Sequence, residues 1–484
     1  MDYTTPSFLL IFLPATLAVF LVVPSKLKRW IILAASLAFI VIAQPFYFVF
    51  FIAYSLLSYF LGRWIEHIRN TGAKTNVALI VSILFQVGLL VGLKYCIQFP
   101  PAFPNPLKLD LPFLVGKSLE QDWVFPLGFS YITFQMISYY VDIENEVIDA
   151  ERNIIHFLNY ILFFPKLISG PIQPYKDSIA ELSNPCATIP RTEAGIRRFI
   201  VGLAKKVLVA DTIANYINPV FNQTIPYLHT HQAWFVLILY AIQLLNDFSG
   251  YTDMAIGLGE MLGIKLMENF NWPYVSKSMT EFWRRWHISL SGFFRDYLFT
   301  PLQFRFRKMK TYPVQASILV VFLFTGLWHG FEMHYIAWGL FVGAIIGFEA
   351  TKFGKLLKET WRPIQHLWML FWVLMSWVLF RSPGLMFALK FYKSLFGLQG
   401  VVEVLPFSQT APFPVTETSL WLAIIAGVLF AVPVIPRLAK TLKVDLSENK
   451  FWQVISFIGL LFILVYSIGV IASKGPMPGI YGQF

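Results

Sequence analysis

Two of the eight histidines lie where an imidazole could take part in acid–base chemistry. His329 lies in the apolar run VVFLFTGLWHGF, near the small residues Thr325, Gly326 and Gly330. Small residues let another backbone or a ligand approach closely, and a neutral imidazole there could accept a proton from a hydroxyl or thiol group. A single histidine in an apolar run is, however, often a hydrogen-bonded structural residue. The residues alone leave both interpretations open.

The second histidine, His287, lies in the charged stretch EFWRRWHISLSGFFRDYLFTPL, residues 281–302. Dense charge between long apolar segments is costly and by default marks a functional site. His287 follows Arg284 by three residues and precedes Ser291 by four, so one continuous helix would place all three on the same face. Guanidinium groups bind phosphate through paired hydrogen bonds. We therefore expect a phosphorylated cofactor to be bound by Arg284, Arg285, Ser291 and Arg295. The alternative is an interfacial helix whose arginines lie near lipid head groups.

The other polar patterns are less specific. The segment NDFSGYTD carries Asp247 and Asp253, which could pair with the arginines, orient a histidine or form a structural ion pair. The histidines of HGFEMH are five residues apart, which excludes the HExxH spacing of zinc proteases, and no GxSxG or phosphate-binding glycine loop occurs. The two cysteines, Cys96 and Cys186, are far apart. We expect no metal site.

Composition places the chain in a membrane. Of its 484 residues, 57% are hydrophobic and 13% are charged. Soluble domains carry about 25% charged residues, so we predict an all-α polytopic membrane protein with the lipid bilayer as its surroundings. The net charge of +11 is typical of basic loops that orient a membrane protein, and no nucleic-acid-binding motif accompanies it. We expect no nucleic acid partner.

A bilayer-spanning helix needs about 20 apolar residues. The apolar runs predict membrane segments near 7–23, 30–43, 46–61, 77–97, 123–141, 207–224, 233–249, 313–331, 334–351, 366–381, 416–435 and 451–473. Prolines interrupt residues 153–170, which we interpret as a re-entrant hairpin.

Loop charge predicts the orientation of these segments. The loop at 26–29 is basic and the turn at 44–45 is uncharged, which places the N-terminus on the outer side of the membrane. The clusters at 305–310 and 352–362 are then cytoplasmic, so the turn near Glu332 and Met333 faces outward. We therefore expect His329 near the outer end of its helix and His287 to approach from the cytoplasmic side.

These motifs together resemble the membrane-bound O-acyltransferase (MBOAT) family, most closely its bacterial alginate O-acetylation branch. The resemblance extends from about residue 5 to the C-terminus and is consistent with a single domain over residues 1–484. It rests on PLGFSYITFQ at 126–135, FFPKLISGPI at 163–172, DFSGYTDMAIG at 247–257, ENFN at 268–271, the stretch 282–302, GLWHG at 326–330 and IYGQF at 480–484. Asn246 and Gly482 depart from the usual pattern and leave the acceptor open.

The resemblance implies a bowl of about 11–12 transmembrane helices with re-entrant segments around a central tunnel. It implies that His329 is the catalytic base and that His287 assists. It also implies that acetyl-CoA donates an acetyl group from the cytoplasm. A periplasmic partner, either an SGNH-type O-acetyltransferase or an acetyl carrier protein, would then esterify a polysaccharide such as an alginate-like exopolysaccharide or peptidoglycan.

Two alternatives remain beside this expectation. One is D-alanyl transfer to teichoic acid from a carrier protein, an activity within the same family. The other is a membrane protein that exports or assembles polysaccharide without catalysis. Such a transporter is expected to show an internal repeat, and we find none in the sequence.

Overall fold

The computed structural model describes residues 1–72, 76–98, 125–222, 228–309, 311–398, 417–434, 437, 450–477 and 479. Within these residues the regular structure is helical, and no strand occurs. The chain divides into two compact units, each described below by itself. The first unit comprises Met1–Phe199, Tyr251–Met267 and Ile471–Gln483, and the second comprises Ile200–Gly250 and Glu268–Val470. The single domain over residues 1–484 stays a prediction.

The first unit contains the N-terminal helices. They are η1 (Phe8–Phe12), α1 (Leu13–Val22), α2 (Ser25–Ala43), η2 (Pro45–Tyr47), α3 (Phe48–Asn70), α4 (Asn76–Gln98), α5 (Phe129–Glu144), α6 (Ile154–Leu162), α7 (Phe164–Leu167), η4 (Tyr175–Asp177) and α8 (Ile179–Ser183). Two of the motifs pack against each other here. Gly128, before α5, has φ +66°, and a Cβ atom at this position would overlap the backbone oxygen of Leu167. Only glycine permits this approach.

The segment predicted as a re-entrant hairpin, residues 153–170, forms two short helices. The Asn153 side chain caps α6 by accepting a hydrogen bond from the Ile155 N–H. The helix ends at Phe163, whose ψ of 105° breaks the helical path before α7 begins. Lys166 in α7 is buried, and its ammonium group donates to Gln135 Oε1 at 3.1 Å. The break at Phe163 agrees with the expected interruption, while re-entry into a membrane stays a prediction.

The second unit contains the elements around both histidines. They are η5 (Lys205–Ala210), α10 (Asp211–Phe221), η6 (Pro273–Val275), α12 (Met279–Arg285), α13 (Ile288–Phe294), η7 (Arg295–Phe299), α14 (Thr300–Phe306), α15 (Pro313–His329), α16 (Met333–Glu349), α17 (Lys352–Glu359), α18 (Arg362–Arg381), α19 (Leu385–Leu395), α21 (Thr418–Ala431) and most of α23 (Lys450–Lys474). Helices α9 (Ile189–Ala204) and α11 (Thr230–Met261) contribute residues to both units.

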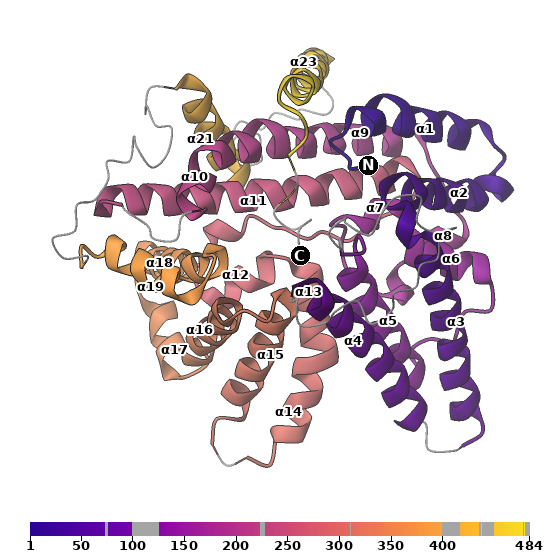
Figure 1. Cartoon of the computed structure of the whole chain (residues 1–484), viewed down its shortest axis with the longest axis horizontal. Helices are drawn as coiled ribbons and strands as arrows, with labels where there is room; N and C mark the ends of the chain where they lie inside the picture. The colour runs from indigo at the N-terminus through magenta and orange to yellow at the C-terminus, as the bar shows by residue number, and fades with distance from the viewer. Residues whose placement is uncertain are drawn as a thin grey trace. The chain divides into compact units, whose positions relative to one another are not determined.

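Helices α15 and α16 form a close antiparallel pair (Figure 1). A Cβ atom on Gly326 would lie 2.5 Å from the Tyr335 carbonyl oxygen, and one on Gly339 would overlap the Phe322 carbonyl oxygen. The two backbones therefore touch through glycines, as small residues allow in membrane helix pairs. The expected close approach at Gly326 is confirmed, and so is the turn between the helices, since α15 ends at His329 and α16 begins at Met333.

Five helices are long and apolar enough to cross a bilayer: Pro45–Asn70, Val77–Lys94, Thr230–Met261, Arg362–Arg381 and Phe451–Lys474. Met333–Glu349 and Lys352–Glu359 together make a sixth, bent by 72°. Shorter apolar helices of 10–17 residues include Phe8–Val22 and Pro313–His329. The all-α multi-pass class is confirmed, whereas the count of 11–12 spanning helices stays a prediction.

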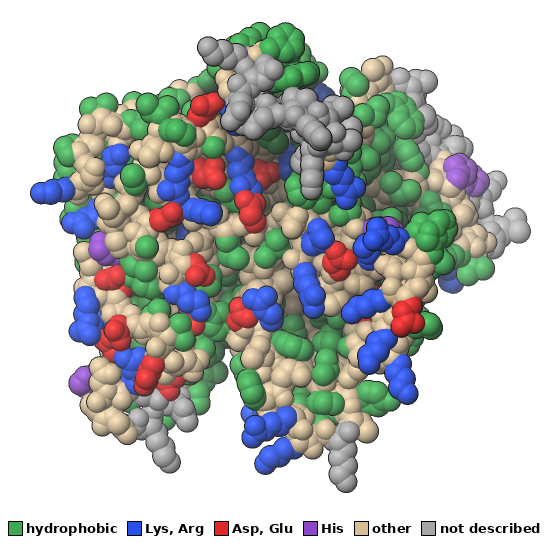
Figure 2. All heavy atoms as spheres, turned by 180° about the vertical axis from the view of Figure 1, so that it is seen from behind, with side chains coloured by type: hydrophobic (Ala, Val, Ile, Leu, Met, Phe, Trp, Pro, Cys, Tyr) green, Lys and Arg blue, Asp and Glu red, His purple; other side chains and the backbone are tan. Residues whose placement is uncertain are grey.

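Large apolar side chains remain exposed on these helices, especially on α23, where Phe451, Ile458 and Phe462 are more than half exposed. Exposure of this kind suits lipid rather than water. The face drawn in Figure 2 also carries charge: Lys and Arg side chains lie near Asp and Glu side chains at several places on it. The protein thus presents both lipid-compatible and charged surfaces.

Candidate active site

The chain breaks its helical path at His287. Helix α12 begins at a capping arrangement in which Ser278 Oγ accepts from the Glu281 N–H, while the Glu281 carboxylate accepts from the Lys277 N–H. The helix ends at Arg285, Trp286 is extended, and His287 has φ 45° and ψ 56°. The expectation that Arg284, His287 and Ser291 share one helical face is therefore wrong.

Asn269, 18 residues upstream, explains this break. Its backbone oxygen accepts from the Ile288 N–H at 2.9 Å, and its side-chain oxygen accepts from the Ser289 N–H at 3.1 Å and the Ser289 hydroxyl at 3.0 Å. The first N–H groups of a helix have no partner within that helix. Asn269 supplies this partner to α13 from another segment, so a new helix can begin directly after His287.

The same oxygen fixes the protonation of the His287 ring. Asn269 Oδ1 lies 3.1 Å from His287 Nδ1, and it already accepts from the Ser289 N–H, which identifies it as oxygen rather than nitrogen. An amide oxygen only accepts hydrogen bonds, so Nδ1 of His287 carries the proton and donates. The basic lone pair is then on Nε2. The ring is 1% exposed, and this burial lowers the pKa of His287 well below its ordinary value.

His329 is the last residue of α15 and is 6% exposed. Aromatic rings surround it: ring centres lie at 4.6 Å for Trp328, 4.9 Å for Phe380, 5.1 Å for Trp338 and 6.0 Å for Tyr335. The rings of Trp338 and Phe380 are nearly perpendicular to the imidazole. This packing fixes the position of the imidazole in a low-dielectric environment.

A row of aromatic rings in the second unit connects the surroundings of the two histidines. The ring of Trp286, next to His287 in the chain, lies 5.1 Å from that of Trp377. Trp377 lies 5.7 Å from Phe380, which in turn contacts His329 at 4.9 Å. Both histidines therefore belong to one packed cluster.

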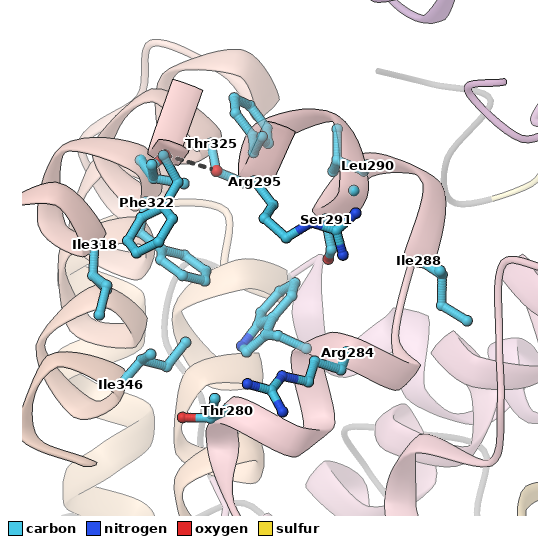
Figure 3. Close-up of a pocket in the computed structure, with 15 residues that line it drawn as sticks. Thr280, Arg284, Ile288, Leu290, Ser291, Arg295, Ile318, Phe322, Thr325 and Ile346 are labelled. Carbon is cyan, nitrogen blue, oxygen red and sulfur yellow. Dashed lines mark hydrogen bonds between the residues drawn. The ribbon is translucent and has the colours of Figure 1, made fainter. Parts of the chain in front are cut away.

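A cavity of about 340 Å³ lies beside this cluster in the second unit (Figure 3). Three of the four residues predicted to bind a cofactor line it: Arg284, Ser291 and Arg295. The other lining residues are Thr280, Trp283, Ile288, Leu290, Gly292, Phe294, Phe299, Ile318, Val321, Phe322, Thr325 and Ile346. Neither histidine is among them. We refer to this space as the Arg284 cavity.

The fourth predicted residue, Arg285, lies outside the lining of the cavity. Its guanidinium group forms an ion pair with Glu281, at 2.9–3.0 Å, and donates to the Asn271 carbonyl oxygen at 3.2 Å. Its hydrogen bonds are thus used within the protein. Its role in binding a cofactor stays a prediction that this geometry does not support.

The Arg284 cavity combines positive charge with apolar walls. In Figure 3, Arg284 extends toward Thr280 and Arg295 extends toward Ser291. Arg295 forms an ion pair with Asp296 at 2.7 and 3.0 Å, whereas Arg284 forms no ion pair with any residue that the structure describes. At the other side the lining reaches Thr325, one helical turn before His329. The space suits an elongated ligand with an anionic group and an apolar arm.

The two carboxylates of NDFSGYTD pair with basic residues outside the stretch 281–302. Asp247 lies 2.8 Å from the Lys206 ammonium group. Asp253 accepts from two nitrogens of Arg198, at 2.9 and 3.0 Å. Among the three interpretations given above, these contacts support structural ion pairs.

Sequence patterns did not reveal Glu349, which holds the start of α12. Its carboxylate accepts from the N–H groups of Met279 and Thr280 at 2.8 and 2.9 Å, from the Thr280 hydroxyl at 2.7 Å, and from the Trp368 indole at 2.9 Å. A single glutamate at the end of an apolar run gave no signal of this contact. Asn269 was part of a motif, ENFN, but its link to His287 is apparent only in three dimensions.

Comparisons with known proteins fit this arrangement. Residues 120–389, more than half of the chain, match the membrane-bound O-acyltransferase family. The chain is 33% identical over 402 residues to a probable alginate O-acetylase of Azotobacter vinelandii, covering 82% of this chain and 78% of that protein. It is 31% identical over 437 residues to a peptidoglycan O-acetyltransferase of Helicobacter pylori, covering 82% and 80%. A teichoic acid D-alanyltransferase of Bacillus subtilis is 32% identical over 227 residues, covering 44% of this chain and 56% of that protein.

These similarities include every stretch that lines the Arg284 cavity, since all of its residues fall within the matched range 120–389. Relatives at this level of identity and coverage share their fold and class of chemistry. The chain is a multi-pass O-acyltransferase that belongs to the membrane-bound O-acyltransferase family.

Proposed function

We propose that this acyltransferase takes an acetyl group from cytoplasmic acetyl-CoA and moves it across a bacterial inner membrane for O-acetylation of an extracytoplasmic polysaccharide. Relatives named for alginate and for peptidoglycan, each aligned with 82% of the chain, support this class of acceptor. The observation that carries the proposal is the Arg284 cavity. It has a cation without an ion-pair partner among the described residues, and its lining ends one turn from His329.

The residues of the cavity fit the proposed donor. Arg284 and Arg295 would hold its phosphates, and the apolar side chains between them and Thr325 would contact its uncharged arm. When bound, the donor supplies an activated thioester. The protein then has to orient an acceptor hydroxyl group, remove its proton and exclude water.

His329 is the proposed base. Its imidazole takes the proton of the acceptor hydroxyl as that oxygen bonds to the acetyl carbon, and the carbon–sulfur bond breaks. The proton then returns from the imidazole to the leaving sulfur, so that charge and atoms balance. General-base help of this kind contributes on the order of 10²–10⁴-fold. His287, with its basic Nε2, assists as a second proton acceptor.

The outer half of the pathway is also part of the proposal. We assign the N-terminus to the periplasmic side from loop charge. The acetyl group is then received by an SGNH-type O-acetyltransferase or an acetyl carrier protein, which completes the esterification.

The test is acetyl transfer by purified full-length protein in lipid nanodiscs with radiolabelled acetyl-CoA. We expect His329→Ala to lower turnover at least about 100-fold at unchanged protein level. Arg284→Gln should raise KM for acetyl-CoA, whereas Arg285→Gln, its neighbour outside the cavity, should leave KM near that of the wild type. Wild-type turnover in His329→Ala would remove this residue from the chemistry.

A second candidate is D-alanyl transfer from a carrier protein to teichoic acid, favoured by the similarity to the Bacillus subtilis D-alanyltransferase. That alignment covers 44% of this chain, against 82% for the two O-acetylating relatives. Turnover with a D-alanyl carrier protein and none with acetyl-CoA would select it. Membership in a family of O-acyltransferases argues against export or assembly without catalysis.

A further inference from the structure

A second cavity, of about 470 Å³, lies in the second unit and shares no lining residue with the Arg284 cavity. Its lining residues are Tyr274, Val275, Lys277, Arg362, His366, Leu370 and Arg437. We refer to it as the Lys277 cavity. Nothing in the proposed acetyl transfer uses it.

Positive charge dominates this lining. Lys277, Arg362 and Arg437 are cationic at neutral pH, and no Asp or Glu lines the cavity among the residues that the structure describes. Within the described part of the chain, neither Lys277 nor Arg362 forms an ion pair with a carboxylate. Lys277 and Arg362, two cations beside one space, repel each other, and a bound anion relieves this repulsion.

The walls of the Lys277 cavity come from separate segments that are hydrogen-bonded to each other. His366 Nδ1, on α18, lies 2.8 Å from the Ser276 carbonyl oxygen, directly after η6. The Tyr274 hydroxyl donates to the Ala241 carbonyl oxygen on α11 at 2.9 Å and accepts from the Trp377 indole on α18 at 3.2 Å. These bonds fix η6 against α18, so the backbone positions that carry Lys277 and Arg362 are set before a ligand arrives.

The chemistry of the lining selects among anions. An arginine fork binds phosphate through two parallel hydrogen bonds, and a lysine adds a compact charge. Arg362 is also the first residue of α18, a 20-residue helix whose N-terminal end favours negative charge. Val275 and Leu370 add an apolar side, which a free inorganic ion does not need but a lipid or nucleotide body does.

We propose that the Lys277 cavity binds an anionic phosphate group. The source is either the head group of an anionic phospholipid or a soluble phosphate compound. Loop charge predicts that the basic clusters at 352–362 and 437–443 face the cytoplasm, where anionic lipids and phosphates are both present. Basic pockets between membrane helices on this side are a known setting for anionic head groups.

The experiment is native mass spectrometry of the full-length protein released from nanodiscs of phosphatidylglycerol or phosphatidylcholine. We compare the wild type with Lys277→Gln/Arg362→Gln. The matched control is Lys355→Gln/Lys358→Gln, which removes two exposed α17 lysines outside the cavity. Each neutralised cation should weaken retention of phosphatidylglycerol about fivefold. The double variant Lys277→Gln/Arg362→Gln, called the cavity pair below, should therefore weaken it about 25-fold. The control variant should retain nearly as much phosphatidylglycerol as the wild type.

The two sources are separated by adding inorganic phosphate. If the wild type retains phosphatidylglycerol but not phosphatidylcholine, and the cavity pair loses it, a lipid head group is the ligand. If inorganic phosphate at millimolar concentration raises the melting temperature of the wild type but not of the cavity pair, a soluble phosphate is the ligand. Equal behaviour of wild type, cavity pair and control toward both probes would overturn the proposal.

The single variant Arg362→Gln provides the test if the double variant Lys277→Gln/Arg362→Gln does not fold. Arg362 is exposed and forms no hydrogen bond with a described side chain, so its replacement should leave the fold intact. It should weaken binding about fivefold. Arg284→Gln, in the other cavity, should not change phosphatidylglycerol retention, which separates this proposal from the acetyl-transfer proposal.

Discussion

The amide oxygen of Asn269 lies 3.1 Å from Nδ1 of His287 and at the same time caps the helix that follows this histidine. One side chain therefore sets both the tautomer of the ring and the path of the backbone. Asn269 is a positioning residue for a proposed proton acceptor, and its replacements should reveal which of these two tasks matters for turnover.

Asn269→Ala should lower kcat with little change in KM for acetyl-CoA, because it removes the oxygen that orients His287, whereas Glu349 still holds the start of α12, which carries Arg284. A misplacement of a reacting group by about 1 Å can cost about 100-fold in rate. Steady-state kinetics in nanodiscs measure the split between kcat and KM. Equal loss in both parameters, with a lowered melting temperature, would indicate a merely structural role.

Asn269→Asp keeps the oxygen and adds a negative charge beside the ring. A carboxylate stabilises the imidazolium form, so the pKa of His287 should rise. If neutral His287 is required, activity of this variant should fall at low pH in a range where the wild type is unaffected. A pH profile of kcat from pH 5 to 8 tests this. A profile identical to that of the wild type would exclude His287 from proton transfer.

The lowered pKa of His287 also predicts how stability depends on pH. The unfolded chain binds a proton at this histidine below about pH 6.5, whereas the folded chain does not until a much lower pH. Above about pH 6.5 the histidine is neutral in both states and the full stability is present. As the pH falls below about 6.5, only the unfolded state gains the proton, so the free energy of unfolding decreases by about 1.4 kcal/mol for each pH unit. Melting temperatures in detergent at pH 7 and pH 5 should differ less in His287→Gln than in the wild type. An unchanged difference would contradict the assignment.

Glu349→Gln should destabilise the protein although it is nearly isosteric. The carboxylate accepts from three N–H groups and one hydroxyl, and an amide nitrogen cannot accept. An N–H group on α12 or α18 would lose its partner, at a cost of about 1–3 kcal/mol. Thr280→Val removes only the hydroxyl bond and should cost less. The melting temperatures of the two variants give the comparison, and a larger loss in Thr280→Val would refute this account of Glu349.

Gly326→Ala should separate α15 from α16. The new methyl group would lie 2.5 Å from the Tyr335 carbonyl oxygen, which is backbone and cannot rotate away. Overpacking of this kind costs about 1–3 kcal/mol, and the shift would move His329 three residues further along α15. Gly469→Ala on α23 is the control, because nothing lies within 4 Å of its added methyl group. Activity and melting temperature should fall in the first variant only.

Several features of the fold could be predicted because they depend on local sequence. The apolar run at 313–331 predicts helix α15, which spans Pro313–His329. The next apolar run, at 334–351, predicts a second helix and hence the turn near Glu332 and Met333. Arg284, Ser291 and Arg295 line one cavity, although the continuous helix expected to bring Arg284 and Ser291 together is absent; their binding of a cofactor stays a prediction. Short helices kept them close even though the chain breaks between them.

What could not be predicted depends on contacts between distant segments. The break at His287 requires Asn269, and the start of α12 requires Glu349, 70 residues from Met279. The pattern of residues 281–302 is compatible with one helix, and only the external cap makes two helices preferable. For the same reason Arg285 could not be distinguished from Arg284, since its use in the ion pair with Glu281 depends on where α12 ends.

The capping of α13 by Asn269 has a consequence for local opening of the protein. The amides of Ile288 and Ser289 are held by Asn269, which precedes them by 19 and 20 residues, and not by their own helix. They can exchange with solvent deuterium only when the segment around Asn269 detaches. The two segments therefore open as one cooperative unit, and slow exchange at Ser289 would report that Asn269 stays in place beside the His287 ring.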